Sequence, residues 1–173
     1  MRVINLSLLN TNWYIKQLKH LEPRVPITLT DETIDALNIQ AWDDREVEIA
    51  GISWTVPRAG ILRNDIGFLR VQDLMILHIL EQNNWEKPVF FAVTVSPEND
   101  VGLDEHMQLE GMVWRVVQKP NPDLMDLDRT QHNLWNVYQY RGIADPAVYK
   151  NKQIQTLLRN YTASFHQLAL NRW

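Results

Sequence analysis

The predicted fold is built around one stretch, Pro88-Val89-Phe90-Phe91-Ala92-Val93-Thr94-Val95. This run is strand-length and almost wholly apolar, which is typical of a strand buried on both faces of a parallel sheet. A second nearly continuous apolar run, Val3–Leu9, predicts another strand of the same kind. We therefore expect Phe90, Phe91 and Val93 to be buried in a central strand.

Helical segments alternate with these strands. Apolar spacing predicts helices over Trp13–Leu21, Thr30–Leu37, Leu69–Gln82 and Leu103–Leu109. Two alternating segments, 46–49 and 52–56, form a predicted hairpin around Ala50-Gly51, and a further strand is expected over Met112–Gln118. This order predicts an α/β fold, in which a mostly parallel sheet is covered by helices in Rossmann-like layers.

A helical extension is expected after the proline-rich segment that begins at Lys119. We predict a sheet domain over residues 1–119 and a helical extension over 120–173 packed on it. Asp145-Pro146 is typical of a helix start. An apolar stripe then runs through Ile154, Leu157, Leu158, Tyr161, Phe165 and Leu168. Such a stripe needs a partner, which we expect to be the segment around Leu134–Tyr138 and, at its far end, a second copy of the chain.

Composition excludes several classes of function. The 173 residues hold 17 Lys and Arg against 21 Asp and Glu, a net charge of −4, and no basic run. This balance argues against a protein that binds nucleic acid or an anionic membrane. The absence of cysteine excludes thiol catalysis, zinc–cysteine sites and disulfides. No uncharged apolar stretch approaches the roughly 18 residues that a membrane-spanning helix needs.

Motifs that carry chemistry are mostly missing from the sequence. It has no glycine-rich nucleotide loop, no serine elbow and no H-E-x-x-H pair of zinc ligands. His106 and Glu110 have metal-ligand spacing but no third ligand, so an exposed polar pair is expected. Asp100 and Asp104 lack the ligand pattern of a calcium loop, and His78 is expected in the core. We predict no catalytic residue, no metal and no cofactor.

A binding site is predicted where two polar loops follow apolar strands. In parallel sheets, ligands bind beyond the carboxyl ends of the strands. The loops after Leu9 and Val95 supply the candidate ligand-binding residues Asn10, Asn12, Trp13, Glu98 and Asp100. The alternative is that Asn10 and Asp100 only cap the helices that follow them. Trp13 and Trp42 are the tryptophans whose faces could pack on a sugar ring.

Several segments together resemble a known family. They are Val3–Ile15, Lys87–Val95, Gly102–Val117, and Tyr140–Ile143 with Asp145-Pro146 and Asn160-Tyr161. In this order they are similar to large bacterial membrane proteins known as domain of unknown function 2723, grouped with glycosyltransferase family 117. A eukaryotic relative of that family is a protein O-mannosyltransferase. One departure is Asn12, where the family is expected to have Asp.

The resemblance implies a soluble piece of a longer polypeptide on the extracytoplasmic, periplasmic side of a bacterial membrane. Its expected partners are the membrane-spanning region of the same polypeptide and a glycan or peptide acceptor, and not nucleic acid. The implied function is to position the acceptor or to brace the membrane region, without catalysis by this chain alone. Two alternatives stay open: a free-standing module that binds a small polar ligand, and a protein-interaction domain that associates through its last helix.

Overall fold

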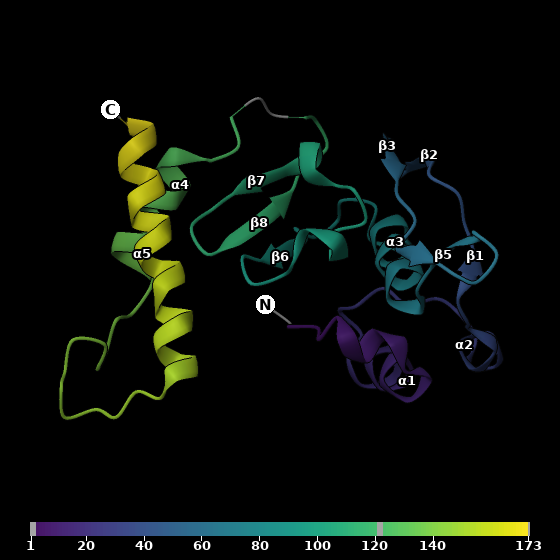
Figure 1. Ribbon diagram of the computed structural model, residues 1–173, viewed down its shortest axis with the longest axis horizontal. Coiled ribbons are helices and arrows are strands. Elements are labelled where there is room, and N and C mark those ends of the chain that lie inside the picture. The colour runs from purple at the N-terminus through teal and green to yellow at the C-terminus, as the bar shows by residue number, and fades with distance from the viewer. Residues whose placement is uncertain (1–2, 121–122, 173) are drawn as a thin grey trace. The chain divides into compact units, whose positions relative to one another are not determined.

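The computed structural model describes residues 3–120 and 123–172 of the chain. It divides the chain into two compact units, each built from separate stretches of sequence (Figure 1). Unit 1 comprises Met1–Val89 and Ser96–Asp104, and unit 2 comprises Phe90–Val95 and Glu105–Trp173. The segment 120–173, expected as a helical extension, therefore lies in unit 2 together with three strands.

Unit 1 contains short helices and two small antiparallel sheets. Its helices are α1 (Asn12–Leu21), α2 (Asp31–Ala36) and α3 (Val71–Asn83), with 3₁₀ turns η1 (Ser7–Asn10) and η2 (Pro97–Asn99). One sheet has the order β1-β5-β4, from strands β1 (Gln40–Ala41), β4 (Gly60–Ile61) and β5 (Gly67–Leu69). The other sheet is a hairpin of β2 (Arg45–Ile49) and β3 (Ile52–Val56).

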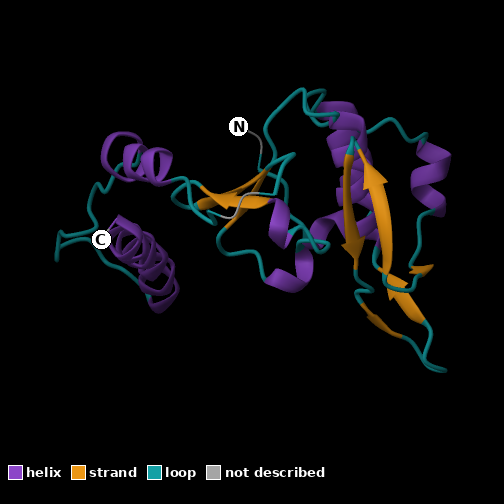
Figure 2. Cartoon of the chain, turned by 90° about the horizontal axis from the view of Figure 1, so that it is seen from above, coloured by secondary structure: helices purple, strands orange, loops and turns teal. Residues whose placement is uncertain are grey.

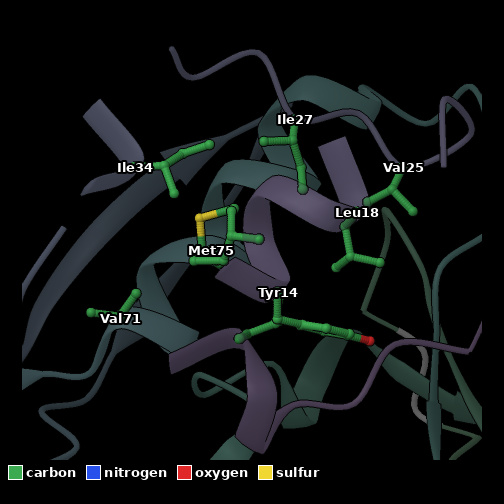
Figure 3. Packing of buried hydrophobic residues seen from close by; sticks show 9 residues of the cluster. Tyr14, Leu18, Val25, Ile27, Ile34, Val71 and Met75 are labelled. Carbon is green, nitrogen blue, oxygen red and sulfur yellow. The ribbon is translucent and has the colours of Figure 1, made fainter. Parts of the chain in front are cut away.

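The core of unit 1 lies where α1 and α3 meet the turns around them (Figure 3). Helix spacing places Tyr14 and Leu18 of α1 on one face, and Met75 of α3 faces the same cluster. The cluster of buried residues is Leu9, Tyr14, Ile15, Leu18, Val25, Ile27, Ile34, Val71 and Met75. This core therefore joins η1, α1 and α2 to the first turns of α3, and it contains no residue between Ile34 and Val71.

The hairpin and all three helices predicted for this unit are confirmed. Ala50 and Gly51 both have positive φ, 50° and 78°, as a tight two-residue hairpin turn requires. Alternation along β3 buries Trp54 and Val56, and α3 lies against the hairpin (Figure 2). The Thr30 hydroxyl caps α2 by accepting a hydrogen bond from the amide of Thr33.

Unit 2 packs helices on a three-stranded antiparallel sheet of order β6-β8-β7. Its elements are β6 (Phe90–Ala92), η3 (Asp104–His106, shared with unit 1), β7 (Met107–Leu109), β8 (Val113–Val116), α4 (Leu127–His132), the π-helical η4 (Asn133–Val137) and α5 (Lys152–Arg172). Leu134 and Leu168 are buried together, which confirms the expected partner of the last helix. Among the described residues, no helix combines the length and apolarity needed to cross a membrane.

The predicted parallel sheet is wrong, because every pair of named strands is antiparallel. The run Val3–Leu9 is not a strand: it ends in the 3₁₀ turn η1. The Asn5 side chain accepts a hydrogen bond from the Leu8 amide, and the Tyr14 hydroxyl accepts one from the Asn5 amide. A polar side chain thus satisfies the backbone locally, and the chain folds back onto α1 instead of extending.

Three further expectations fail because neighbouring segments compete for the backbone. Strand β6 is an edge strand, so Phe91 is buried but Phe90 and Val93 are only half-buried. Half of the helix predicted over Leu103–Leu109 is instead β7, which pairs with β8. The helix expected at Asp145-Pro146 begins only at Lys152, after a run of turns. By contrast, the expected buried or half-buried position of His78 is confirmed, since His78 is half-buried and accepts a hydrogen bond from the Thr28 amide.

Two adjacent phenylalanines test the edge-strand assignment. Phe91→Ala should lower the free energy of unfolding by about 3–5 kcal/mol, because the buried ring leaves a cavity. Phe90→Ala, on the other face of the same strand, should cost clearly less, because its ring is already half-exposed. Urea unfolding followed by circular dichroism measures both. Equal losses would contradict the assignment of β6 as an edge strand with one covered face.

Candidate functional site

The two loops that carry the predicted site do meet, at the amino end of α3 and not at strand ends. The side-chain amide of Gln72, in the first turn of α3, lies 2.8 Å from the Asn10 amide and 2.8 Å from the Asn99 amide. The Gln72 backbone N–H donates to Asn10 Oδ1 at 3.0 Å. One buried glutamine thus joins the loop after η1 to the loop around η2. We call Asn10, Gln72 and Asn99 the amide junction.

The side-chain amides of the amide junction form hydrogen bonds with one another. Gln72 is 4% exposed, so its amide needs partners inside the protein. In one orientation of that amide, Asn10 Nδ2 donates to Gln72 Oε1 and Gln72 Nε2 donates to Asn99 Oδ1. In the swapped orientation, Gln72 instead donates to the Leu6 carbonyl at 3.3 Å and accepts from the Arg70 guanidinium at 3.2 Å. Both orientations satisfy the amide without a ligand.

Arg70 reinforces the same connection through charge. Its guanidinium makes a two-point ion pair with Asp73, at 2.9 Å from each carboxylate oxygen. The same guanidinium donates to the backbone carbonyl of Glu98 at 2.9 Å. Asp73 is 1% exposed and also caps α3 by accepting from the Arg70 amide. Glu98 therefore takes part through its backbone, and its carboxylate is exposed.

The other predicted site residues of the first loop face elsewhere. Asn12 Nδ2 donates to the Asp35 carbonyl at the end of α2, at 3.1 Å. Trp13 is 60% exposed, and its ring meets the ring of Tyr14 edge to face. Trp42, the second sugar-packing candidate, is buried and its face is covered by the Arg45 guanidinium at 3.5 Å. Of the two tryptophans, only Trp13 presents a free ring face.

Asp100 is the titratable group of this region. It is buried, and its Oδ1 accepts a hydrogen bond from the Gly102 amide at 3.0 Å. Burial, opposed by the Gly102 hydrogen bond and assisted by the negative charge of the neighbouring Asp104, raises the pKa of the Asp100 carboxyl to about 6. The Asp100 carboxyl therefore changes between its protonated and charged forms near pH 6.

The backbone beside Asp100 is held in an unusual conformation. Val101 has a φ of 55°, which is strained for a β-branched residue. Its carbonyl accepts a hydrogen bond from the Trp54 indole at 2.9 Å, which offsets part of that strain. Gly102 has a φ of 78°, and a side-chain carbon there would lie 2.5 Å from the Thr55 carbonyl. The hairpin thus fixes the loop that presents Asp100.

His106 and Glu110, the pair with metal-ligand spacing, make structural contacts inside unit 2. His106 Nδ1 lies 3.1 Å from the Val117 carbonyl, and Glu110 is 5% exposed. Two guanidiniums, of Arg115 and Arg129, lie 3.3 Å and 3.2 Å from Glu110 Oε1. Both residues of the pair are buried, contrary to the expected exposed pair. Within the described ranges, no group of three side chains could hold a metal ion.

Sequence reasoning expected the last helix to contact the segment around Leu134–Tyr138, but it missed that this contact is an aromatic cluster that includes Tyr140. The Trp135 ring meets Phe165 at 4.8 Å, and the Tyr140 ring lies 5.5 Å from Tyr161 and 6.0 Å from Phe165. Tyr138 meets Tyr161 at 6.1 Å. Although Trp135 is part of this cluster, it is 61% exposed. The available signal was the close spacing of Trp135, Tyr138 and Tyr140 along the chain.

Removal of the central amide should loosen the contact between the two loops. Gln72→Ala leaves the Asn10 and Asn99 amides without their shared partner, so we expect a loss of about 1–3 kcal/mol in the free energy of unfolding. Gln82→Ala is the matched control, since Gln82 is an exposed glutamine of the same helix. Denaturant unfolding compares the two. A loss no larger than that of the control would show that the junction does not stabilise unit 1.

Asp100 should make stability depend on pH. Its pKa in the folded protein, about 6, lies above its ordinary 3.8, so the folded state favours the protonated form. The stabilisation is complete below pH 3.8 and is lost as the pH rises through 6. Asp100→Asn imitates the protonated carboxyl, so the variant should be more stable than the original at about pH 8 and show no such gain at about pH 4.

The pH comparison needs a control for net charge. Asp43→Asn removes one negative charge from an exposed loop of the same unit. Chemical unfolding of all three proteins at both pH values separates the local effect from the general one. A gain for Asp100→Asn that is the same at both pH values, or that Asp43→Asn reproduces, would contradict the raised pKa.

A comparison with known proteins adds a family. The family model described as TMEM260-associated domain 2 matches residues 24–133, more than half of the chain. No curated protein and no solved structure matches. The expected membership of the bacterial family of unknown function 2723 is therefore wrong, because the matched model describes a different domain. The resemblance to that bacterial family rested partly on Val3–Ile15 and on the segments between Tyr140 and Tyr161. These parts of the chain lie outside the matched residues.

Proposed function

Because the chain belongs to the TMEM260-associated domain 2 family, we propose that it is an accessory domain of a membrane protein and is not catalytic by itself. In this proposal the domain lies on the extracytoplasmic side and braces the membrane-spanning region of a glycosyltransferase-like polypeptide. The family name supports the link to a membrane protein. The bracing role, the side of the membrane and the sugar chemistry of the parent protein are the finer parts of the proposal.

The observation that carries the bracing role is the internal use of the polar groups at the predicted ligand site. Gln72 and Asp73 are almost completely buried, and their side chains bind Asn10, Asn99 and Arg70. A ligand would have to compete with these hydrogen bonds, and each buried polar group left unpaired would cost about 1–3 kcal/mol. A junction in which buried polar side chains bind one another is typical of a structural contact between two loops. It favours a bracing domain over a module that binds a small polar ligand.

Unit 2 supplies the feature that a bracing domain needs, an exposed apolar surface. Trp135 and Val137 of η4 are 61% and 52% exposed, and Leu157 of α5 is 54% exposed. Large apolar side chains that gather on a surface are typical of sites that contact another protein or a membrane. Edge-to-face contact with Phe165 holds the Trp135 ring in place, so little conformational entropy is lost when it is covered.

Because these 173 residues contain no cysteine, a single cysteine can be introduced into the domain to test the proposal. We expect Trp135→Cys, carrying a photoactivated cross-linker, to join the membrane-embedded part of the protein in native membranes. Ile61→Cys, an exposed aliphatic position in unit 1, is the matched control and should not cross-link there. A membrane-impermeant maleimide should label Ile61→Cys from the extracytoplasmic side in intact cells.

Activity of the isolated chain provides the second test. Incubation with a polyprenyl-phosphate-linked sugar or a sugar nucleotide, with a peptide acceptor, should give no transferred label. Transfer by the purified chain would overturn the non-catalytic role. Equal cross-linking from Trp135→Cys and Ile61→Cys would overturn the bracing role, and labelling only after the membrane is opened would place the domain on the other side.

A further inference from the structure

The net charge of the chain conceals an uneven distribution. Residues 1–130 hold 12 Lys and Arg against 20 Asp and Glu. Residues 131–172 hold five basic residues, Arg141, Lys150, Lys152, Arg159 and Arg172, against the single acid Asp145. The last part of unit 2 is therefore positive by four charges in a chain whose total is −4. The negative net charge argues against an anionic partner for the surface as a whole, but it does not argue against one for this segment.

Most of these basic groups are not neutralised inside the protein. Arg172 pairs with Asp128 at 2.9 Å, whereas Lys150 Nζ donates only to the backbone carbonyls of Asp145 and Val148. Lys152 and Arg159 are exposed, and neither has an ion pair among the described residues. Their charges are available to an anionic partner.

The same segment exposes large apolar side chains. Tyr149 is 84% exposed, Trp135 is 61% exposed, and Ile154 and Leu157 of α5 are 42% and 54% exposed. Tyrosine and tryptophan combine an apolar ring with a polar atom, which suits them to the boundary between water and lipid. These four side chains with Lys150 and Lys152 form what we call the basic aromatic surface.

Helix geometry connects the parts of the basic aromatic surface. Leu157, Tyr161 and Phe165 follow at four-residue spacing along one face of α5, and Trp135 meets Phe165. Leu168, further along the helix, is buried in unit 2, whereas the first turns of α5 are uncovered. Gln155 Nε2 donates to the Lys150 carbonyl at 3.0 Å, which attaches the preceding loop to these turns.

The first turns of α5 also separate charge from apolar side chains. Lys152 and Arg159 are seven residues apart and share one face of the helix, opposite the exposed Ile154 and Leu157. Basic side chains on one face and large apolar side chains on the other are the arrangement of helices that lie in the plane of a membrane surface. The helix does not need to cross the membrane for this contact.

We propose that the basic aromatic surface binds the surface of a lipid bilayer that carries anionic headgroups. The proposal rests on the bracing role and specifies the contact through which the domain would be held at the membrane. The basic side chains supply attraction to the headgroups, and Trp135, Tyr149 and the start of α5 enter the boundary region. Charge complementarity favours this partner over a second copy of the same surface, whose positive charge would repel the first.

Vesicle flotation tests the proposal with the isolated chain. The probes are vesicles of phosphatidylcholine alone and of phosphatidylcholine with about one third anionic phosphatidylglycerol. We expect the chain to float with the anionic vesicles, to bind neutral ones weakly, and to be released at high salt, which screens headgroup attraction. Lys150→Glu with Lys152→Glu should weaken binding by roughly tenfold or more, because each basic residue near the surface contributes to the attraction.

A second variant pair separates the apolar contribution from the charge. Ile154→Glu with Leu157→Glu should also abolish flotation, because charged groups replace the side chains that enter the boundary region. Ile61→Glu with Arg63→Glu is the matched control, since it adds the same kinds of change to exposed residues of unit 1. Circular dichroism and thermal unfolding verify that all variants fold like the original chain.

Each other outcome overturns the proposal. They are no flotation of the original chain, equal loss in the control pair, or equal binding to neutral and anionic vesicles. Light scattering that shows a dimer lost in Ile154→Glu with Leu157→Glu, without vesicle binding, would assign the surface to a second copy. Failure of flotation alongside a Trp135→Cys cross-link to the membrane-embedded polypeptide would leave the bracing role standing and remove only the lipid contact.

Discussion

Unit 1 depends on a small set of hydrogen bonds that join two separate stretches of chain. Its second stretch, Ser96–Asp104, follows a passage through unit 2, so covalent connectivity alone does not place it. Three bonds attach it to the first stretch: from Gln72 to Asn99, from Arg70 to the Glu98 carbonyl, and from Trp54 to the Val101 carbonyl. All three donors belong to α3, its capping residue or β3. This attachment holds the Val101 backbone in its strained conformation and keeps the Asp100 carboxyl buried.

Unit 2 depends in the same way on a few hydrogen bonds, which are made by the turn that follows β7. Thr130 is completely buried, and its hydroxyl donates to the Leu109 carbonyl and accepts from the Gly111 amide. The Ser164 hydroxyl donates to the Gly111 carbonyl at 2.9 Å, so α4 and α5 both attach to the same turn. Gly111 has a φ of 87°, and a side-chain carbon there would lie 2.9 Å from the Tyr138 hydroxyl. One glycine thus permits both the turn and the close approach of the helical segments.

Local signals in the sequence were sufficient for the three helices and the hairpin of unit 1 and insufficient for its other strands and for the pairing of strands. The spacing of Tyr14 and Leu18 identifies α1, and the Ala50-Gly51 turn identifies the hairpin, because both depend on neighbouring residues. The direction of a strand depends on partners that are distant in the sequence. The same short apolar run is compatible with a parallel strand, an edge strand or a turn that packs into a core. Gln72 could not be found this way, since a lone glutamine in a helix carries no mark of its partners 62 and 27 residues away.

The segregation of charge has a consequence for how such a domain would be oriented at an anionic membrane. The acidic surplus of residues 1–130 is repelled by negative headgroups, while the positive segment 131–172 is attracted. A chain with the same net charge spread evenly would have no preferred orientation. Attraction of the positive segment 131–172 favours an orientation of unit 2 with the start of α5 toward the lipid. Because both terms act over about 10 Å at ordinary salt, they orient the domain only close to the surface, where the exposed rings of Trp135 and Tyr149 come within reach of the lipid boundary.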